Sequence, residues 1–313
     1  MQIASKSLEK SKKSEVKYIC LVLLVMVLWG FLYPAVKVGY KALDIDTSNP
    51  PQILMFAGTR FFICGAIITL ISVFTQKGAV GLKNNIFPIL CMGLLGIVVH
   101  YSLTYIGLTF VDSSKAAMLK KVGELLYICF SFLLIREEKF MITKVIGAFI
   151  GFAGVIALNI TPEGRVSFSW GDVMIVLASI SGISASLFCK KAIKKTSPIM
   201  VTGLSQLFGG MVLIVLARLL HAPRISFSPE GVLILCCICL ASIISYCIWY
   251  YAMGKVLLSK MYILKFAEPF FACIFGAIML KENIFTLQYL FAFILLITGV
   301  AIGVNNKSKK GKL

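Results

Sequence analysis

Ten runs of about twenty apolar residues follow one another along the 313-residue chain. A helix rises 1.5 Å per residue, so a run of this length crosses a hydrocarbon core of roughly 30 Å. The runs are apolar on every side, whereas the strands of a membrane barrel alternate in polarity. The sequence therefore predicts an all-α polytopic membrane protein with ten transmembrane helices, at residues 18–40, 52–74, 86–110, 113–135, 141–160, 171–189, 198–220, 231–253, 259–280 and 285–304.

Positive charge dominates the ionisable residues. The net charge is +18, although only 14% of the residues are charged and 59% are hydrophobic. In a soluble protein such an excess would indicate nucleic-acid binding. With the amino terminus in the cytoplasm, however, 20 lysines and arginines fall in inner segments and seven in outer segments, as the positive-inside rule requires. We therefore expect a multi-pass protein of the plasma membrane with both termini cytoplasmic, in contact with lipid and not with nucleic acid.

The chain contains an internal repeat, because residues 86–140 match residues 231–285 when the sequence is shifted by 145 positions. Each copy belongs to a set of five helices, an odd number, so the second set enters the membrane from the opposite side. Such inverted repeats are typical of transporters that bind substrate between their halves. The matched pairs are Tyr101 and Tyr246, Tyr105 and Tyr250, Lys115 and Lys260, Lys120 and Lys265, Glu137 and Glu282, and Phe140 and Phe285.

These features divide the chain into five segments. A first five-helix repeat is expected at residues 18–160 and a second at 171–304, joined by a linker at 161–170. Basic arms at residues 1–17 and 305–313 are expected in the cytoplasm. Because these arms are rich in lysine and poor in apolar residues, we expect them to be solvated and disordered.

Several short motifs resemble the EamA family, the ten-helix branch of the drug/metabolite transporter superfamily. They are Trp29-Gly30 with Tyr33-Pro34 and Lys37, Arg60-Phe61, Glu268-Pro269, and Leu280-Lys281-Glu282. The resemblance extends over residues 18–305 and implies a transporter with two EamA repeats. One departure is that the fourth helix reads Lys120-Lys121-Val122-Gly123-Glu124 where the family usually has a proline.

Five ionisable residues, more than one turn from the nearest helix end, fall inside the predicted fourth and ninth helices: Lys120, Lys121, Glu124, Lys265 and Glu268. An ionisable group in hydrocarbon costs several kcal/mol unless it is paired or faces water, so each is a candidate for function. Lys120 with Glu124, and Lys265 with Glu268, have the spacing of pairs on one helical face. We expect Lys120 and Lys265 to line a cavity, since both repeats keep a lysine there. Lys121 is equally consistent with a side chain that extends to the headgroups.

Three further polar residues lie within apolar runs. Arg60 matches Gln206 under a shift of 146 positions, and each is either a strut between helices or a ligand contact. His100 is more often a structural hydrogen-bonding group than a proton relay in such a setting. Proton coupling through Glu124, Glu268 or His100 is left open, as are exchange and uniport.

Aromatic residues form the other part of the predicted site. Tyr101 and Tyr105 are spaced i, i+4, and Tyr246 and Tyr250 repeat that spacing in the second half. Tyrosines also collect in interfacial belts, so belt and cavity are equally open for Tyr105 and Tyr250, while Tyr101 and Tyr246 favour the cavity. Trp29 and Tyr33 lie too deep in the first helix for a belt and are expected to form a cavity wall.

The sequence offers little support for other site chemistry. All ten cysteines lie in apolar runs, which indicates buried thiols rather than disulfides or a metal site. No nucleotide-binding loop is present, and no cofactor is expected. Gly147-x-x-x-Gly151 and Gly299-x-x-x-Gly303 suit either packing within a monomer or a homodimer.

Two classes of function therefore remain. The first is a secondary transporter that moves a small polar or zwitterionic metabolite, such as an amino acid, by alternating access through a central cavity. An exporter or importer of an organic cation or a drug-like compound is the alternative within this class. The second class, a lipid-modifying enzyme, needs clustered catalytic residues, whereas the two histidines, His100 and His221, lie in opposite repeats. We therefore expect no enzyme activity.

Overall fold

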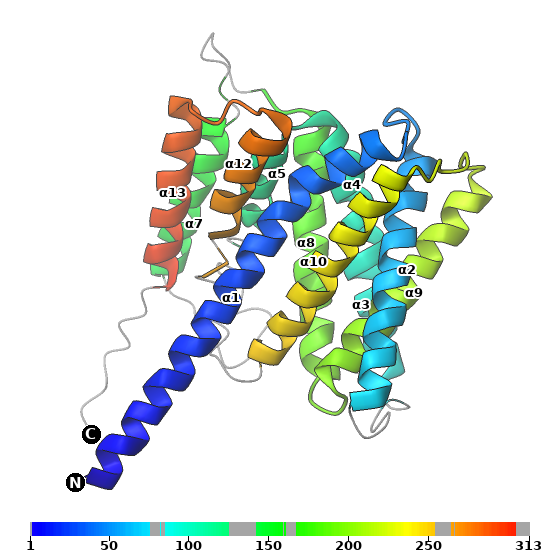
Figure 1. Ribbon diagram of the computed structural model, residues 1–313. Helices are drawn as coiled ribbons and strands as arrows, with labels where there is room; N and C mark the ends of the chain where they lie inside the picture. Colours follow the sequence, from blue (N-terminus) through cyan, green and yellow to red (C-terminus); the bar gives the residue numbers. More distant parts are fainter. Residues whose placement is uncertain are drawn as a thin grey trace.

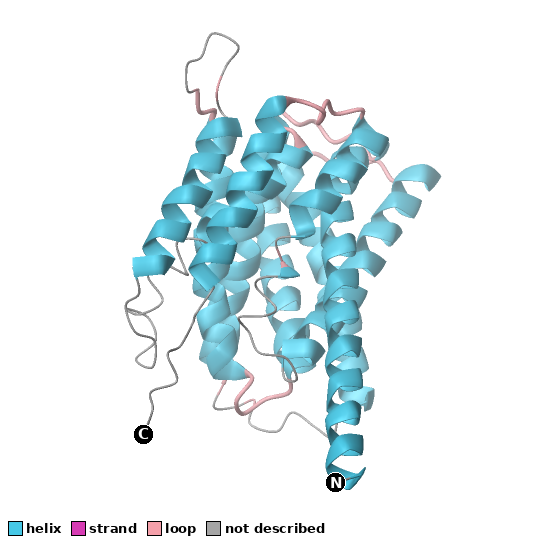
Figure 2. Cartoon of the chain, turned by 90° about the vertical axis from the view of Figure 1, so that its left-hand side faces the viewer, coloured by secondary structure: helices cyan, strands magenta, loops and turns pink. Residues whose placement is uncertain are grey.

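The described part of the chain is built from helices that run side by side in one bundle (Figures 1 and 2). The computed structural model describes the backbone at residues 2–75, 82, 85–124, 142–158, 160, 167–253, 264, 265 and 267–304. The helices are α1 (Gln2–Ala42), α2 (Pro50–Thr75), α3 (Ile86–Gly93), η1 (Leu94–Val99), α4 (His100–Phe110), α5 (Ser113–Leu119), α7 (Ile142–Leu158), α8 (Trp170–Ala192), α9 (Pro198–Leu219), α10 (Pro229–Met253), α12 (Ala267–Leu280) and α13 (Leu287–Val304).

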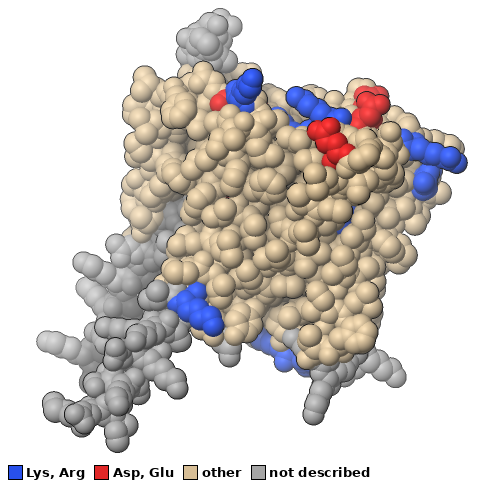
Figure 3. All heavy atoms as spheres, in the orientation of Figure 1, with Lys and Arg blue, Asp and Glu red and all other residues tan. Residues whose placement is uncertain are grey.

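These helices have the lengths and surfaces of a membrane protein. Among the described residues, six spans of at least 22 residues are apolar enough to cross a membrane, and α12 and α13 are shorter apolar helices. The predicted third helix is one continuous span, Ile86–Phe110, with the wider turns of η1 in its middle. On the face drawn in Figure 3, charged side chains lie mainly toward the two ends, with an uncharged band between them. The predicted fourth and ninth helices lie partly outside the described residues.

The prediction of a disordered amino-terminal arm is wrong, because α1 begins at Gln2 and continues without a break to Ala42. The arm is rich in lysine, glutamate and serine, and it also contains Leu8 and Ala4. Lysine, glutamate, leucine and alanine have high helix propensity, so an already formed transmembrane helix propagates into this segment. The arm at residues 305–313 lies outside the described residues.

Glycines let helices from the two predicted repeats pack closely. A Cβ placed on Gly65 of α2 would lie 2.8 Å from the carbonyl carbon of Gln206 on α9. A Cβ on Gly299 of α13 would lie 2.6 Å from the Gly151 nitrogen on α7. These approaches are possible only without side chains. Of the two interpretations of the small-residue motifs, the structure therefore uses Gly151 and Gly299 for packing within the monomer.

Candidate functional site

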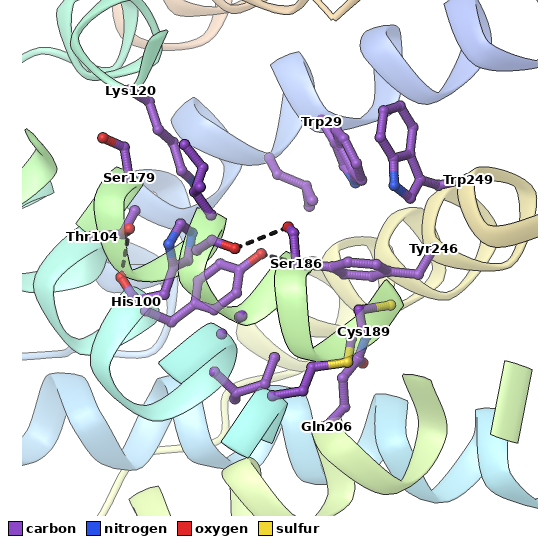
Figure 4. Close-up of a pocket in the computed structure, with 18 of the residues that line it drawn as sticks. Trp29, His100, Thr104, Lys120, Ser179, Ser186, Cys189, Gln206, Tyr246 and Trp249 are labelled. Atoms are coloured by element: carbon purple, nitrogen blue, oxygen red, sulfur yellow. Dashed lines mark hydrogen bonds between the residues drawn. The ribbon is translucent and has the colours of Figure 1, made fainter. Parts of the chain in front are cut away.

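A cavity of about 180 Å³ lies between the helices of the two predicted repeats. Its walls come mainly from α1, α2, α4, α8, α9 and α10 (Figure 4), together with Lys120, Lys121, Glu124, Lys265 and Glu268. Every residue that the sequence singled out lines this cavity: Trp29, Tyr33, Arg60, His100, Tyr101, Tyr105, Lys120, Lys121, Glu124, Gln206, Tyr246, Tyr250, Lys265 and Glu268.

The regular helix is interrupted by a turn at Lys120 and again at Lys265, the matched lysines of the two repeats. Residues 121–124 are helical again, and α12 begins at Ala267. Broken helices at membrane depth are tolerated where they are buried in protein or face a polar cavity. The interruptions therefore bring charged side chains to the cavity from both repeats.

A network of ion pairs connects the two repeats across the cavity wall. Lys121 Nζ lies 2.8 Å from Glu268 Oε2 and 3.3 Å from Glu124 Oε1. Lys265 Nζ lies 2.7 Å from the same Glu124 oxygen. The Tyr33 hydroxyl donates a hydrogen bond to Glu268 Oε1 at 3.0 Å. Each carboxylate is thus held by a cation from the opposite repeat.

The structure excludes one of the two alternatives for Lys121 and contradicts the pairing that spacing suggested for Lys120. The Lys121 side chain is 1% exposed and bound to Glu268, so it does not extend to the headgroups. Lys120 does not pair with Glu124, because no carboxylate of the described residues lies within 4.0 Å of its ammonium group. The turn at Lys120 changes the angle between the two side chains, and neighbouring Lys121 meets the carboxylates in its place.

Several groups in the cavity wall lack a charged or hydrogen-bonding partner among the described residues, and two of them lie within residues 120–124. The Lys120 ammonium lies over the rings of Tyr33 and Tyr101, at 5.4 and 5.5 Å from their centroids. Glu124 Oε2 is buried and has no hydrogen-bond partner among the described residues. Buried polar groups are normally satisfied, so the Glu124 oxygen is a candidate for ligand contact, and the half-buried Lys120 ammonium is a second candidate.

The aromatic residues form a continuous wall. The hydroxyls of Tyr101 and Tyr246, matched residues of the two repeats, meet at 2.5 Å. Tyr105 and Tyr250 are 1% and 8% exposed, which excludes the interfacial belt for both. Trp29 packs against Trp249 with ring centroids 4.9 Å apart, and Lys265 Nζ lies 5.6 Å from the Trp29 ring centroid.

Sequence reasoning missed Trp249, which stands beside Trp29 in the cavity wall (Figure 4). The signal was present, because Trp249 follows Tyr246 by three residues and therefore shares its helical face. Small polar residues of the wall, Thr104, Ser179 and Ser205, were also missed. Serine and threonine are common in transmembrane helices, so nothing in the sequence distinguishes these from packing residues.

His100 has a structural role in this arrangement. Its Nδ1 lies 2.6 Å from the carbonyl oxygen of Ala178 on α8, and its side chain packs against Gly182, where a Cβ would lie 2.7 Å from the same nitrogen. The ring also contacts Tyr101 edge-on. The imidazole therefore joins α4 to α8, in agreement with the structural alternative.

A model of the EamA-like transporter family matches residues 16–160 and 169–304. The chain belongs to the EamA-like transporter family. The resemblance seen in the short motifs is thereby confirmed, and the protein is a multi-pass membrane transporter of the drug/metabolite transporter superfamily rather than an enzyme. Two matches to one family model also agree with an architecture of repeated halves.

Relatives of known sequence support this assignment. The chain is 27% identical over 310 residues to the uncharacterized transporter YoaV of Bacillus subtilis, covering 94% of this chain and 99% of YoaV. It is 25% identical to the uncharacterized transporter YvbV of the same organism, over 93% of this chain and 92% of that protein. A solved protein structure aligns with a TM-score of 0.65 at 16% identity, covering 92% of this chain and 96% of the other. That structure supports the fold.

In this EamA protein, Glu282 connects the repeats at the end of the bundle where α1 ends. Its carboxylate accepts hydrogen bonds from the backbone N–H groups of Ser113 and Ser114, at 2.8 and 3.0 Å. It also accepts hydrogen bonds from the hydroxyls of the same two serines, at 2.7 and 2.5 Å. Lys37 Nζ lies 4.0 Å away. Burial alone would raise the pKa of the Glu282 carboxyl, but the serine hydrogen bonds outweigh it and lower the pKa.

We expect Glu282→Gln to destabilise the protein at neutral pH by about 1–3 kcal/mol, because charge-assisted hydrogen bonds are lost. A lowered folded-state pKa stabilises the fold above the ordinary value of 4.5, and this contribution is lost as the pH falls through the lowered pKa. The melting temperatures of wild type and variant should therefore converge toward acid pH. Glu230→Gln, at an exposed carboxylate, is the control. An equal difference at pH 7 and at acid pH would contradict this role.

Proposed function

We propose that the protein is a secondary transporter that moves an amino-acid-like zwitterion by alternating access through the central cavity. The observation that carries the proposal is that the cavity offers a lysine ammonium without a carboxylate partner and, on the ion-paired Glu124, a second carboxylate oxygen without a hydrogen-bond partner. Lys120 has no carboxylate within 4.0 Å among the described residues, and Glu124 Oε2 has no hydrogen-bond partner. An α-carboxylate and an α-ammonium would satisfy these two groups at once.

The cavity walls favour a zwitterion over an organic cation. Organic cations bind to open aromatic faces. Here Lys265 lies over Trp29 and Trp249, with Nζ 5.6 and 5.9 Å from the ring centroids, and Lys120 lies over Tyr33 and Tyr101. The protein's own ammonium groups therefore occupy these faces, and a second cation would be repelled.

The repeat architecture supports alternating access. We propose ten transmembrane helices in two inverted repeats, residues 18–160 and 171–304, with both termini on the cytoplasmic side of the plasma membrane. The direct contact of Tyr101 with Tyr246 supports a pseudo-twofold axis that passes close to the cavity. The ion pairs between Lys121 and Glu268 and between Lys265 and Glu124 cross between the repeats, so a rocking motion would rearrange them.

Uptake into proteoliposomes tests this proposal. We expect purified protein to take up at least one of a panel of labelled amino acids faster than empty liposomes do, and excess unlabelled substrate to compete. Parallel uptake with and without a pH gradient distinguishes proton coupling from exchange or uniport. Tetraethylammonium serves as the organic-cation probe. Transport of this cation without transport of any amino acid, or no transport by well-folded protein, would contradict the proposal.

A further inference from the structure

Two further polar side chains lie in the wall of the same cavity, Arg60 on α2 and Gln206 on α9. Both residues line the cavity, and each is 1% exposed. Figure 4 shows Gln206 on the side of the cavity away from Lys120. The close crossing of α2 and α9 at Gly65 brings the backbone of Gln206 against α2.

The hydrogen bonds of Arg60 leave its charge without a counterion. Nη1 donates to the Tyr105 hydroxyl and Nη2 to Ser242 Oγ, the latter at 2.6 Å. Nε has no partner, and no carboxylate of the described residues forms an ion pair with the guanidinium. Hydroxyl partners satisfy donors but supply no negative charge. The rings of Phe61, Tyr101 and Tyr105, with centroids 4.7, 5.8 and 5.8 Å from Arg60 Cζ, stabilise the cation in part but carry no net charge. A buried cation without a counterion is unfavourable, so this position is suited to an anion.

Gln206 provides a second, independent observation. Neither its Oε1 nor its Nε2 has a hydrogen-bond partner among the described residues, although the side chain is buried. A buried amide normally forms hydrogen bonds, so an amide whose oxygen and nitrogen both lack a partner is a candidate for hydrogen bonding to a ligand. Its NH₂ can donate to an oxyanion, as can the Nε–H of Arg60.

The groups in the cavity wall that lack partners match one class of ligand. Among the described residues, the cations of Lys120 and Arg60 have no carboxylate partner, and the carboxylate oxygen Glu124 Oε2 has no hydrogen-bond partner. We propose that the substrate is an acidic amino acid, with two carboxylates and one ammonium group, whose side-chain carboxylate binds Arg60 and Gln206. This inference rests on the proposed function and narrows its substrate class.

Ligand binding to purified wild-type protein in nanodiscs tests the inference. The probes are L-aspartate, L-glutamate and L-2-aminoadipate, each acidic, with L-asparagine, L-glutamine and L-alanine as neutral counterparts. We expect at least one acidic probe to bind about 10-fold or more tightly than each of the neutral probes. Binding of amino acids with no preference for the acidic probes would overturn the inference and leave the proposed function standing. Binding of none of the probes would count against both.

Two variants separate ligand binding from a structural role. Arg60→Met should abolish the preference for acidic probes, but Arg60 also joins α2 to α4 and α10, so this variant can fail to fold. Gln206→Leu avoids that problem, because it removes a buried amide without hydrogen bonds. We expect a higher melting temperature without ligand and about 10-fold weaker binding of the acidic probe.

Ser72→Ala is the matched control for Gln206→Leu. Ser72 is also buried with an unpartnered hydroxyl on α2, but it does not line the cavity. Its replacement should leave ligand binding unchanged. A lower melting temperature for Gln206→Leu together with unchanged acidic-probe binding would show a strut and overturn the inference.

Discussion

Lys121→Met is expected to destabilise the protein by about 3–5 kcal/mol, the cost of leaving a buried charge without its partner. The Lys121 ammonium lies 2.8 Å from Glu268 Oε2 and 3.3 Å from Glu124 Oε1, and its side chain is 1% exposed. With methionine there, Glu268 keeps only the neutral Tyr33 hydroxyl as a close hydrogen-bond donor among the contacts described above. Thermal unfolding of purified protein in detergent measures the loss.

The double variant Lys121→Met, Glu268→Gln should recover most of this stability, because a buried ion pair replaced by neutral groups of similar size is often close to neutral. Lys37→Met is the control, since its ammonium is 4.0 Å from Glu282 and its side chain is 21% exposed. It should change stability by less than about 1 kcal/mol. Equal melting temperatures for Lys121→Met and wild type, or no recovery in the double variant, would show that the pair does not carry stability.

The sequence could predict the helices and the composition of the cavity wall because both depend on local patterns. Apolar runs have the length that a bilayer requires, and helix ends such as Pro198–Leu219 fall within a few residues of the prediction. The repeat identified the wall, because matched residues such as Lys120 and Lys265 were expected to meet at one cavity between the halves, and both line it. Matching residues across the repeat thus indicated which side chains face the cavity, which the pattern of a single helix does not show.

The partners within the cavity could not be predicted in the same way. Spacing suggested that Lys120 pairs with Glu124, but pairing depends on the direction in which the helix continues after the turn at Lys120. The bond between Lys121 and Glu268 joins residues 147 positions apart. Such a contact is set by the packing of α12 against the first repeat, which no short-range pattern records. The unpartnered amide of Gln206 is likewise visible only after every neighbour has been placed.

Lys120→Met replaces the lysine next to Lys121 and is expected to have a different effect from Lys121→Met. We expect it to lose transport and to leave folding unchanged. Lys120 has no carboxylate within 4.0 Å among the described residues, so its removal leaves no buried carboxylate without a partner. If its ammonium binds the substrate carboxylate, loss of one charge-assisted interaction costs about 1.5–3 kcal/mol, or roughly 10- to 100-fold in affinity. Proteoliposome uptake at several substrate concentrations, with melting temperature measured in parallel, tests both parts.

The comparison of the two adjacent lysines makes this test specific. Both variants remove one positive charge from the same cavity, so a general electrostatic effect on an anionic substrate would weaken transport equally in both. A direct contact instead predicts that Lys120→Met keeps the wild-type melting temperature and loses transport, and that Lys120→Arg recovers part of it because the charge is restored. Normal uptake by Lys120→Met, or a melting temperature lowered as far as in Lys121→Met, would assign Lys120 to the structure and remove it from the substrate site.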